Sequence, residues 1–372
     1  MKIGFLTYSN VDTGAGIEYW LKEVCPRLSK RHKVQIMTSD HGTRTAPIRD
    51  ALAQYGIRTH EFRLLFGASS IPNSTGVKAI RGFFDEHDVI YFFYCPGGLE
   101  ILSSLFQTTV HKRVLAAHTY PPSRYRNTGN VIPVRQLYST LLGDGGLRVG
   151  KYLWAHNVEN EDLKTELKRW KIKRIYKIIA GVDTNSFKPS EKRSRFTVLF
   201  LGRLEATKGA DLLPQLYTML ANRIENFDFM VAGEGTLYAT LKRHETKNFK
   251  FLGFVDDQNK RRLLSSSHVL VAPSRVEALM HVGIEAMASG TPLISSDVSG
   301  VREYLVNGRN GYLVRSLYEM AKMTELVYQF WLSGSGYDNL SRQARESVEA
   351  FSYDRATPKI ERLLIDTAEA NE

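Results

Sequence analysis

The sequence predicts an α/β protein of two Rossmann-like domains, and this prediction rests on its length and its hydrophobic pattern. The chain has 372 residues, too many for one ordinary α/β domain and suitable for two of roughly 180 residues each. Strand-length apolar segments recur along it, with helix-length segments between them. Several, such as 89–93 and 197–201, are continuously apolar, which is typical of strands covered by helices on both faces.

The pattern predicts strands in both halves of the chain. In the first half we expect them at 2–8, 33–38, 57–62, 88–93, 113–118, 151–155 and 174–179. In the second half we expect them at 196–202, 227–232, 249–252, 268–272, 291–295 and 311–314. Because strands and helices alternate regularly, the strands should form parallel sheets with right-handed crossovers.

The halves are separated by a linker, 180–195, that combines glycine, proline and a charged run. We therefore expect an N-terminal domain over 1–180 and a C-terminal domain over 181–350. The last segment, 351–372, is predicted to be a helix that packs back on the N-terminal domain.

The composition favours a cytoplasmic protein. No run of about 18 or more apolar residues is present, so no membrane span is expected. The first residues, 1–8, are interpreted as a buried strand because they are too short and too soon interrupted for a secretory signal. The two cysteines, Cys25 and Cys95, are interpreted as reduced thiols.

The positive charge belongs to the first half. Residues 1–180 hold 26 Lys and Arg against 15 Asp and Glu, an excess that equals the whole chain's net charge of +11. Such a field attracts nucleic acid, anionic lipid headgroups or phosphorylated acceptors. A solvated surface with no specific partner is the alternative.

The segment 273–292 holds two glutamates, Glu277 and Glu285, after a predicted strand. Open α/β sheets place their ligands at this end of their strands. Eight residues of helix span about 12 Å, and the amides near 280–282 would open a helix that attracts phosphate. Glu277 would bind sugar hydroxyls, the amides a diphosphate, and Glu285 ribose hydroxyls. By spacing alone, the same pair also occurs on ordinary surface helices.

A second segment, 202–209, follows the first strand of the second half and contains Arg203 and Lys208 between glycines. Arginine offers a bidentate fork and lysine a compact point charge. Together they could neutralise a diphosphate leaving group. An ordinary basic loop is the alternative.

With these segments in place, the sequence resembles the family 4 retaining glycosyltransferases of group 1, whose fold is named GT-B. The resemblance covers nearly the whole chain. It rests, in chain order, on Gly181-Val182-Asp183 with Phe187 and Pro189, Gly202-Arg203-Leu204 with Lys208-Gly209, Gly233-Glu234-Gly235, Leu252-Gly253-Phe254-Val255, and Pro273-Ser274 through Glu277 and Glu285 to Pro292. It implies two Rossmann-like domains with parallel sheets facing across a cleft, the C-terminal one binding the donor.

The resemblance also implies residue roles in the C-terminal half. Arg203 and Lys208 look like the pair that stabilises the departing diphosphate. Glu277 looks like the carboxylate that touches the donor sugar, and Glu285 like the ribose ligand. The backbone around Phe254 would meet the base.

In the N-terminal half, His118 matches the histidine that faces the transferred sugar, although a lone histidine at a strand end is more often structural. Gly14 and Gly16 match the glycine loop near the donor phosphates, but Ala15 separates them. Beside His281 and Val282, whose amides should bind the donor, Met280 stands where the family usually has glycine. Ala180 replaces a common asparagine. These departures leave the donor sugar open more than the reaction type.

The expected reaction is transfer of a hexose from a UDP- or GDP-sugar with retention, in the synthesis of a cell-surface glycan, polysaccharide or glycolipid. No side chain in the motifs stands out as a nucleophile, which fits the family's proposed route in which the leaving diphosphate takes the acceptor proton. Catalysis would then rest on positioning and on cations. No Asp-x-Asp cluster is evident, so we expect no metal and no cofactor beside the donor substrate.

The acceptor is expected on the basic N-terminal half. Cations gather there with aromatic residues interleaved, as at membrane interfaces: Lys164, Lys168, Arg169, Lys171, Lys173, Arg174, Lys177, Arg124, Arg126 and Arg135, with Trp170, Tyr176, Tyr120 and Tyr125. The hypothesis is a peripheral protein on the inner face of the cell membrane that extends a glycan or lipid-phosphate-linked acceptor.

The sequence offers three alternative functions. A GT-B epimerase or hydrolase would share the donor site but need no acceptor. An NAD-dependent oxidoreductase is suggested by Gly14, Gly16 and Asp40, but Tyr19 replaces the third glycine of that fingerprint. A nucleic-acid-binding protein would explain the basic half but not the motifs, and no recognisable module supports it. No nucleic-acid partner is therefore expected.

Overall fold

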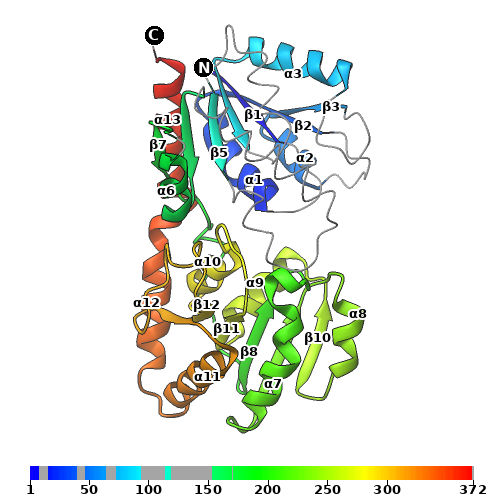
Figure 1. Cartoon of the computed structure of the whole chain (residues 1–372), viewed down its shortest axis with the longest axis vertical. Helices are drawn as coiled ribbons and strands as arrows, with labels where there is room; N and C mark the ends of the chain where they lie inside the picture. The colour runs from blue at the N-terminus through cyan, green and yellow to red at the C-terminus, as the bar shows by residue number, and fades with distance from the viewer. Residues whose placement is uncertain are drawn as a thin grey trace. The chain divides into compact units, whose positions relative to one another are not determined.

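The computed structural model describes residues 1–7, 16–39, 47–63, 73–93, 114–118, 153–169 and 171–370, without the side chains of 47, 48 and 115–118. This part of the chain divides into two compact units. The N-terminal unit holds the described residues up to Ala180 and those from Tyr353 onward, and the C-terminal unit holds Gly181–Ser352. Figure 1 shows the described helices and strands coloured along the chain from blue to red.

The described strands of the N-terminal unit form one parallel sheet of seven in the order β3-β2-β1-β4-β5-β6-β7. They are β1 (Lys2–Leu6), β2 (Lys33–Ser39), β3 (Arg58–Phe62), β4 (Val89–Phe93), β5 (Val114–His118), β6 (Ala155–Val158) and β7 (Ile175–Lys177). The described helices of this unit are α1 (Gly16–Ser29), α2 (Pro47–Ala53), α3 (Ser74–Glu86), α6 (Glu161–Arg169) and α13 (Tyr353–Ala368).

The position of strand β4 in the sheet explains why its sequence is continuously apolar. All of its residues are buried, and alternate side chains enter two different cores. Tyr91 and Phe93 join Trp20 of α1 in a core that also includes residues of α13, and Trp20 stacks on Tyr91 with ring centroids 5.3 Å apart. Ile90 and Phe92 join the residues of α3 on the other face.

Helix α13 is fixed to the N-terminal unit by charged contacts as well as by its apolar face. The Glu361 carboxylate lies 2.6 Å from a guanidinium nitrogen of Arg31 and 2.7 Å from His32 Nε2. Asp354 accepts a hydrogen bond of 2.9 Å from Arg27 on α1. The chain therefore returns, after the C-terminal unit, to the sheet where it began.

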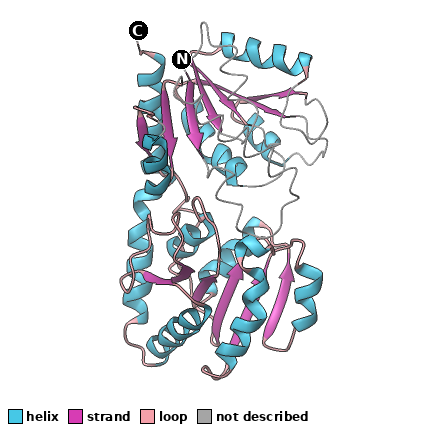
Figure 2. Ribbon diagram, viewed as in Figure 1, coloured by secondary structure: helices cyan, strands magenta, loops and turns pink. Residues whose placement is uncertain are grey.

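The C-terminal unit contains a parallel sheet of six strands in the order β10-β9-β8-β11-β12-β13. The strands are β8 (Phe196–Leu201), β9 (Phe227–Ala232), β10 (Phe249–Gly253), β11 (Val269–Ala272), β12 (Leu293–Ser296) and β13 (Gly311–Val314). The helices are α7 (Leu213–Ala221), α8 (Tyr238–Leu241), α9 (Asp257–Ser266), α10 (His281–Ala288), α11 (Leu317–Leu332) and α12 (Tyr337–Val348), with short 3-10 turns η3 (Ala206–Lys208), η4 (Ala210–Leu212), η5 (Lys242–His244) and η6 (Glu349–Phe351). Figure 2 shows these helices around the strands.

Both strand orders reverse direction once, between β1 and β4 and between β8 and β11. In a doubly wound sheet this switch point, at the carboxyl ends of the strands, is where ligands bind. The expectation of two parallel α/β sheets is therefore confirmed.

The strands predicted for the second half coincide with the observed ones to within two residues at each end. In the first half, β6 begins at Ala155, where the predicted strand 151–155 ends. The predicted strand was placed too early in the chain because β6 contains buried polar residues, which do not look like strand residues in the sequence. Asn157 donates to Tyr91 Oη at 3.1 Å and accepts from the Ile178 amide at 2.9 Å, so its polar side chain is satisfied inside the sheet.

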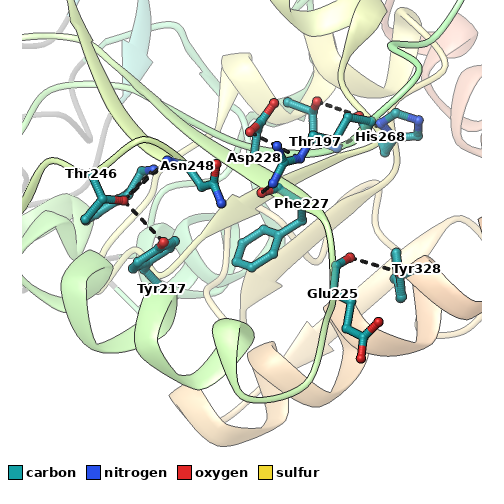
Figure 3. A network of polar contacts seen from close by, with 11 residues as sticks. Thr197, Tyr217, Glu225, Phe227, Asp228, Thr246, Asn248, His268 and Tyr328 are labelled. Carbon is teal, nitrogen blue, oxygen red and sulfur yellow. Dashed lines mark hydrogen bonds and ion pairs between the residues drawn. The ribbon is translucent and has the colours of Figure 1, made fainter.

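The amino ends of the C-terminal strands are closed by contacts that fix the fold (Figure 3). The Thr197 amide donates to His268 Nδ1 at 3.0 Å. Tyr328 Oη donates to the Glu225 carbonyl at 3.0 Å, and Tyr217 Oη lies 3.2 Å from Thr246 Oγ1. A ligand site in this unit is expected at the opposite edge, where the strands end.

Candidate functional site

The loops that follow β8 and β11 lie against each other at the switch point of the C-terminal sheet. Gly209 has φ +69°, and a Cβ placed on it would come within 2.0 Å of the Pro273 carbonyl oxygen. The Arg275 amide also donates to the Thr207 carbonyl at 2.9 Å. Only glycine permits both this conformation and this approach, so the Gly209 in the sequence motif is what brings the two loops together.

The contact between these loops brings Lys208 and Glu277 together. Lys208 Nζ donates to both carboxylate oxygens of Glu277, at 2.8 and 2.7 Å. Ser274 Oγ donates to Glu277 Oε1 at 2.8 Å. Glu277 is only 7% exposed, so its charge needs these donors in place of water.

Helix α10 begins at His281 and carries Glu285 in its second turn. Lys260, on α9, donates to Glu285 Oε1 at 2.9 Å, and each side chain is 15% exposed. Burial raises the pKa of the Glu285 carboxyl, and the charge and hydrogen bond of Lys260 oppose that rise. Each glutamate of the sequence motif therefore forms an ion pair with a different lysine.

The start of α10 lies between these two pairs. Met280 is the N-cap residue, its side chain is buried, and no side chain caps the helix. Its carbonyl accepts from Tyr304 Oη at 3.0 Å. His281 has its pKa lowered to about 4 by burial, with Lys260 and Lys208 adding to the fall and a hydrogen bond to the Gly181 backbone opposing it.

His281 is therefore neutral near pH 7, and Val282 beside it is half-buried. Helix starts present amide donors and a positive dipole end to an anion, although in α10 the His281 amide already donates to the Leu279 carbonyl at 3.1 Å. Because His281 is neutral near pH 7, its side chain adds no charge to the start of α10.

Arg203 and Phe254 lie in the loops after β8 and β10, at the same edge of the sheet and on either side of the loop after β9. The Arg203 side chain is exposed, and within the described ranges no hydrogen bond or ion pair holds its guanidinium. Phe254 follows β10 directly and is 75% exposed. The Gly233 amide donates to the Gly253 carbonyl at 2.7 Å, which joins the loop after β9 to the loop that carries Phe254.

In the N-terminal unit, the predicted residues are described only in part. Gly16 opens α1 and is exposed, whereas Gly14 lies outside the described residues. His118 ends β5, where it pairs in register with Val158, but its side chain lies outside the description. The structure therefore places Lys208 against Glu277, and the roles of all the predicted site residues in both halves stay predictions.

The basic segment of the N-terminal unit is formed by α6 and β7. Its exposed cations include Lys168, Arg169, Lys171 and Lys173, none of which has an ion-pair partner in the described part of the chain. Lys164 and Lys177 lie 3.4 and 2.8 Å from Glu161, and Arg174 lies over the Trp154 ring at 4.9 Å. Further predicted members lie outside the described residues, namely Trp170, Tyr120, Tyr125, Arg124, Arg126 and Arg135.

The described residues hold neither a metal-binding cluster nor a membrane-spanning helix. No group of three or more His, Cys, Asp and Glu side chains there could hold a metal ion. No helix among them has the length and apolar character needed to cross a membrane.

Sequence reasoning missed two side chains that contact the predicted glutamates. Ser274 stands inside the motif and was given no role. Lys260 belongs to the charged run 256–262, which looks like the solvated face of a surface helix. Spacing to Glu285 gives no signal for Lys260, because the pair joins two separate helices.

Known proteins share the part of the chain that forms these loops and ion pairs. Residues 182–347 match the model of the family described as glycosyl transferases group 1. The match covers nearly all of the C-terminal unit, Gly181–Ser352. The matched range contains both lysine–glutamate pairs and the loops that carry Arg203 and Phe254.

Curated relatives share parts of the chain. An uncharacterized glycosyltransferase of Methanocaldococcus jannaschii is 34% identical over 125 residues, 32% of this chain and 31% of that protein. A phosphatidyl-myo-inositol mannosyltransferase of Mycobacterium tuberculosis is 32% identical over 162 residues, 40% of this chain and 42% of that protein. The spore coat protein SA of Bacillus subtilis is 28% identical over 227 residues, 52% of this chain and 58% of that protein. The chain thus aligns with less than two thirds of each of these relatives.

Solved structures match the fold over almost the whole chain. Anabaena HepE in complex with UDP and glucose has a TM-score of 0.77 at 18% identity, covering 98% of this chain and 100% of that one. A glycosyltransferase from Rickettsia africae has a TM-score of 0.76 at 17% identity, covering 100% and 99%. At these identities the likeness concerns the fold, and the fold is that of the GT-B glycosyltransferases.

Proposed function

We propose that this protein is a retaining glycosyltransferase that moves a hexose from a nucleotide-diphosphate sugar to a glycan or lipid-linked acceptor. The observation that carries the proposal is the pair of lysine–glutamate contacts, Lys208 with Glu277 and Lys260 with Glu285, on either side of the start of α10. Along the segment 277–285, this edge offers a carboxylate, a helix start and a second carboxylate, with a lysine from another element beside each carboxylate. A sugar, a diphosphate and a ribose present matching groups in the same order.

Each group has a defined task in this proposal. Lys208 and Arg203 stabilise the negative charge that grows on the leaving diphosphate, together with the amides at the start of α10. Glu277, oriented by Ser274 and Lys208, accepts hydrogen bonds from hydroxyls of the donor sugar. The backbone around Phe254, in the exposed loop after β10, is assigned to the base of the donor.

In the retaining step, the acceptor oxygen forms its bond to the anomeric carbon on the face from which the diphosphate leaves. The bond between that carbon and the diphosphate oxygen breaks, and the leaving phosphate takes the acceptor proton. This route asks the protein for positioning and for positive charge rather than for a covalent nucleophile. Metal independence belongs to the same proposal. Strong inhibition of transfer by EDTA, reversed by added Mg²⁺ or Mn²⁺, would contradict it.

The related proteins support a nucleotide-sugar donor. Anabaena HepE was crystallised with UDP-glucose, and the partial relative from M. tuberculosis is a phosphatidyl-myo-inositol mannosyltransferase. Donors carrying UDP or GDP and a lipid-linked acceptor are therefore the first to test for this chain.

The decisive experiment is a thermal-shift screen with UDP-, GDP- and ADP-sugars, followed by assays with and without candidate acceptors. A donor that binds the native state raises its melting temperature, and product formation should require an acceptor. Turnover of the donor alone, with no acceptor dependence, would instead indicate a nucleotide-sugar epimerase or hydrolase. Stabilisation by none of these sugars would contradict the proposed donor class.

A further inference from the structure

The Glu285 carboxylate presents two unlike oxygens. Oε1 accepts a hydrogen bond of 2.9 Å from Lys260 Nζ. Oε2 has no hydrogen-bond or ion-pair partner in the part of the chain that the structure describes. One oxygen is therefore held by the protein, and the other remains able to accept a hydrogen bond from a ligand.

Lys260 is itself held in place from several sides. Its helix, α9, is capped by Asp256, which accepts from the Asn259 amide at 2.7 Å. The Lys260 ammonium lies 5.2 Å from the centroid of the Phe187 ring and 3.9 Å from Asp257 Oδ1. It is only 15% exposed, so the ammonium is constrained in a way that a surface lysine is not.

The Phe187 ring connects this lysine to the segment between Gly181 and Pro189, a sequence motif that has no role in the proposed function. Arg345 of α12 donates to the Phe187 carbonyl at 3.0 Å and also bonds the carbonyl of Ala288 at the end of α10. The motif thus contacts Lys260 through the Phe187 ring, and Arg345 links it to α10, the helix that carries Glu285.

The charges around Glu285 show how its contact with Lys260 affects the carboxyl group. Burial raises the pKa of this carboxyl; Lys260 and, more weakly, Arg261 lower it, while Asp257 raises it. His281, one turn earlier on α10, has its pKa lowered to about 4 and is neutral near pH 7. Lys260 is therefore the principal neighbour that favours the ionised form of Glu285, and an ionised carboxylate is a stronger acceptor than a protonated one.

We propose that Lys260 is a positioning residue of the nucleotide site, which fixes Oε1 of Glu285 so that Oε2 accepts hydrogen bonds from the ribose hydroxyls of the donor. The inference rests on the proposed function, because it needs a nucleoside diphosphate at this edge. It adds that ribose recognition depends on a residue outside the glutamate motif, with Phe187 of the junction segment as its support.

The test measures the Kd of UDP and GDP, and of their 2′-deoxy and 3′-deoxy counterparts, by calorimetry between pH 5.5 and 8. In wild type, a deoxy analogue that lacks a recognised hydroxyl should bind more weakly than the ribonucleotide. Lys260→Met should weaken ribonucleotide binding about tenfold at pH 7, because a charge-assisted hydrogen bond is lost. It should weaken deoxy binding much less, so that the two affinities converge.

The pH dependence has a defined sign. Binding through Glu285 needs the carboxylate, so affinity is lost as pH falls through the carboxyl's pKa. Lys260→Met removes the cation that lowers this pKa, so the loss should begin at a higher pH than in wild type. Lys260→Arg should restore much of the affinity, since it keeps the charge. Lys322→Met, an exposed lysine on α11, is the matched control and should change nothing.

The alternatives give different results. A purely structural Lys260 would lower the affinity for ribonucleotide and deoxynucleotide equally and leave the pH profile in place, and this result would overturn the inference alone. If Lys260→Met does not fold, Lys260→Gln with the same titration decides, since it too removes the charge. Wild type that binds neither UDP nor GDP would overturn the inference together with the proposed function.

Discussion

At the scale of single residues, the carboxyl edge of the C-terminal sheet contains two carboxylates that are paired with lysines and one arginine that is unpaired within the described residues. Lys208 is engaged by Glu277 at 2.7 Å, whereas Arg203 is exposed and held by no hydrogen bond or ion pair. The two cations are therefore not equivalent before a ligand arrives. Arg203 can turn to a diphosphate without breaking a contact, while Lys208 must share its charge with Glu277.

This difference predicts the behaviour of alanine variants. Arg203→Ala and Lys208→Ala should each lower kcat by roughly 100-fold or more, because charge on the leaving group is no longer stabilised, and should weaken nucleotide binding far less. Lys208→Ala should also lower the free energy of unfolding by about 2 kcal/mol, since it leaves the Glu277 carboxylate without its cation, whereas Arg203→Ala should not. Steady-state kinetics, calorimetry and urea unfolding measure these effects. Equal losses in kcat and in nucleotide affinity would contradict the assigned role.

A second prediction at this scale concerns His268, before β11, where the amino ends of the strands meet. Burial, with Lys192 and Arg193 nearby, lowers its pKa from 6.5 to about 3. Because the folded-state pKa lies below the unfolded one, the unfolded chain binds the proton first, and stability falls as pH drops from about 6.5 toward 3. His268→Asn, whose Oδ1 can accept from the Thr197 amide, should make this fall shallower in urea unfolding.

The control for that prediction is His244→Asn, at an exposed position of the same unit. It should leave the slope of stability against pH unchanged. Because His268→Asn also alters packing against Trp331, the slope is the measurement and not the absolute stability. An unchanged slope in His268→Asn would show that this imidazole is not a source of the acid sensitivity.

At the scale of elements, the site depends on how the loop after β8 fits against the loop after β11. Gly209→Ala should destabilise the protein by roughly 2 kcal/mol or more, since it adds a left-handed strain and a Cβ against the Pro273 carbonyl. It should also lower donor affinity, because the same contact places Lys208 beside Glu277. Gly308→Ala is a matched control, with φ +77° and no atom within 4 Å of an added Cβ. The two variants should therefore differ, and equal effects on unfolding would mean that backbone strain alone matters.

At the scale of the whole molecule, the charge is distributed unevenly, and the basic segment of α6 and β7 carries the prediction of membrane binding. Replacing Lys168, Arg169, Lys171 and Lys173 with glutamine should reduce co-sedimentation with phosphatidylglycerol vesicles at low salt by at least about tenfold, since each such cation contributes about 1 kcal/mol near an anionic surface. Neutral phosphatidylcholine vesicles should bind neither protein.

The matched control for membrane binding removes the same charge from the C-terminal unit. Replacing Arg243, Lys247, Lys250 and Lys322, all exposed, with glutamine should leave sedimentation with anionic vesicles near the wild-type level. Equal losses in both sets would indicate a non-specific effect of net charge. Wild type that binds no anionic vesicle would remove the membrane hypothesis and leave the proposed transferase activity untouched.

The sequence by itself determined the two parallel sheets, because strands buried on both faces consist of continuous apolar runs such as 89–93 and 197–201. It also indicated which edge of the second sheet to examine, since Lys208, Glu277 and Glu285 all follow strand ends. It misplaced β6 because the buried Asn157 looks like a loop residue until its partners are known.

Only the tertiary structure decided which side chains meet at that edge. Lys208 and Glu277 are 69 residues apart, and Lys260 and Glu285 are 25 apart. Each pair joins different elements, and no local spacing encodes such a contact. The physical reason is that a strand's hydrophobic pattern is a local property, whereas an ion pair needs two backbones brought into register by packing elsewhere, here by the close approach of Gly209 to Pro273 and of α9 to α10.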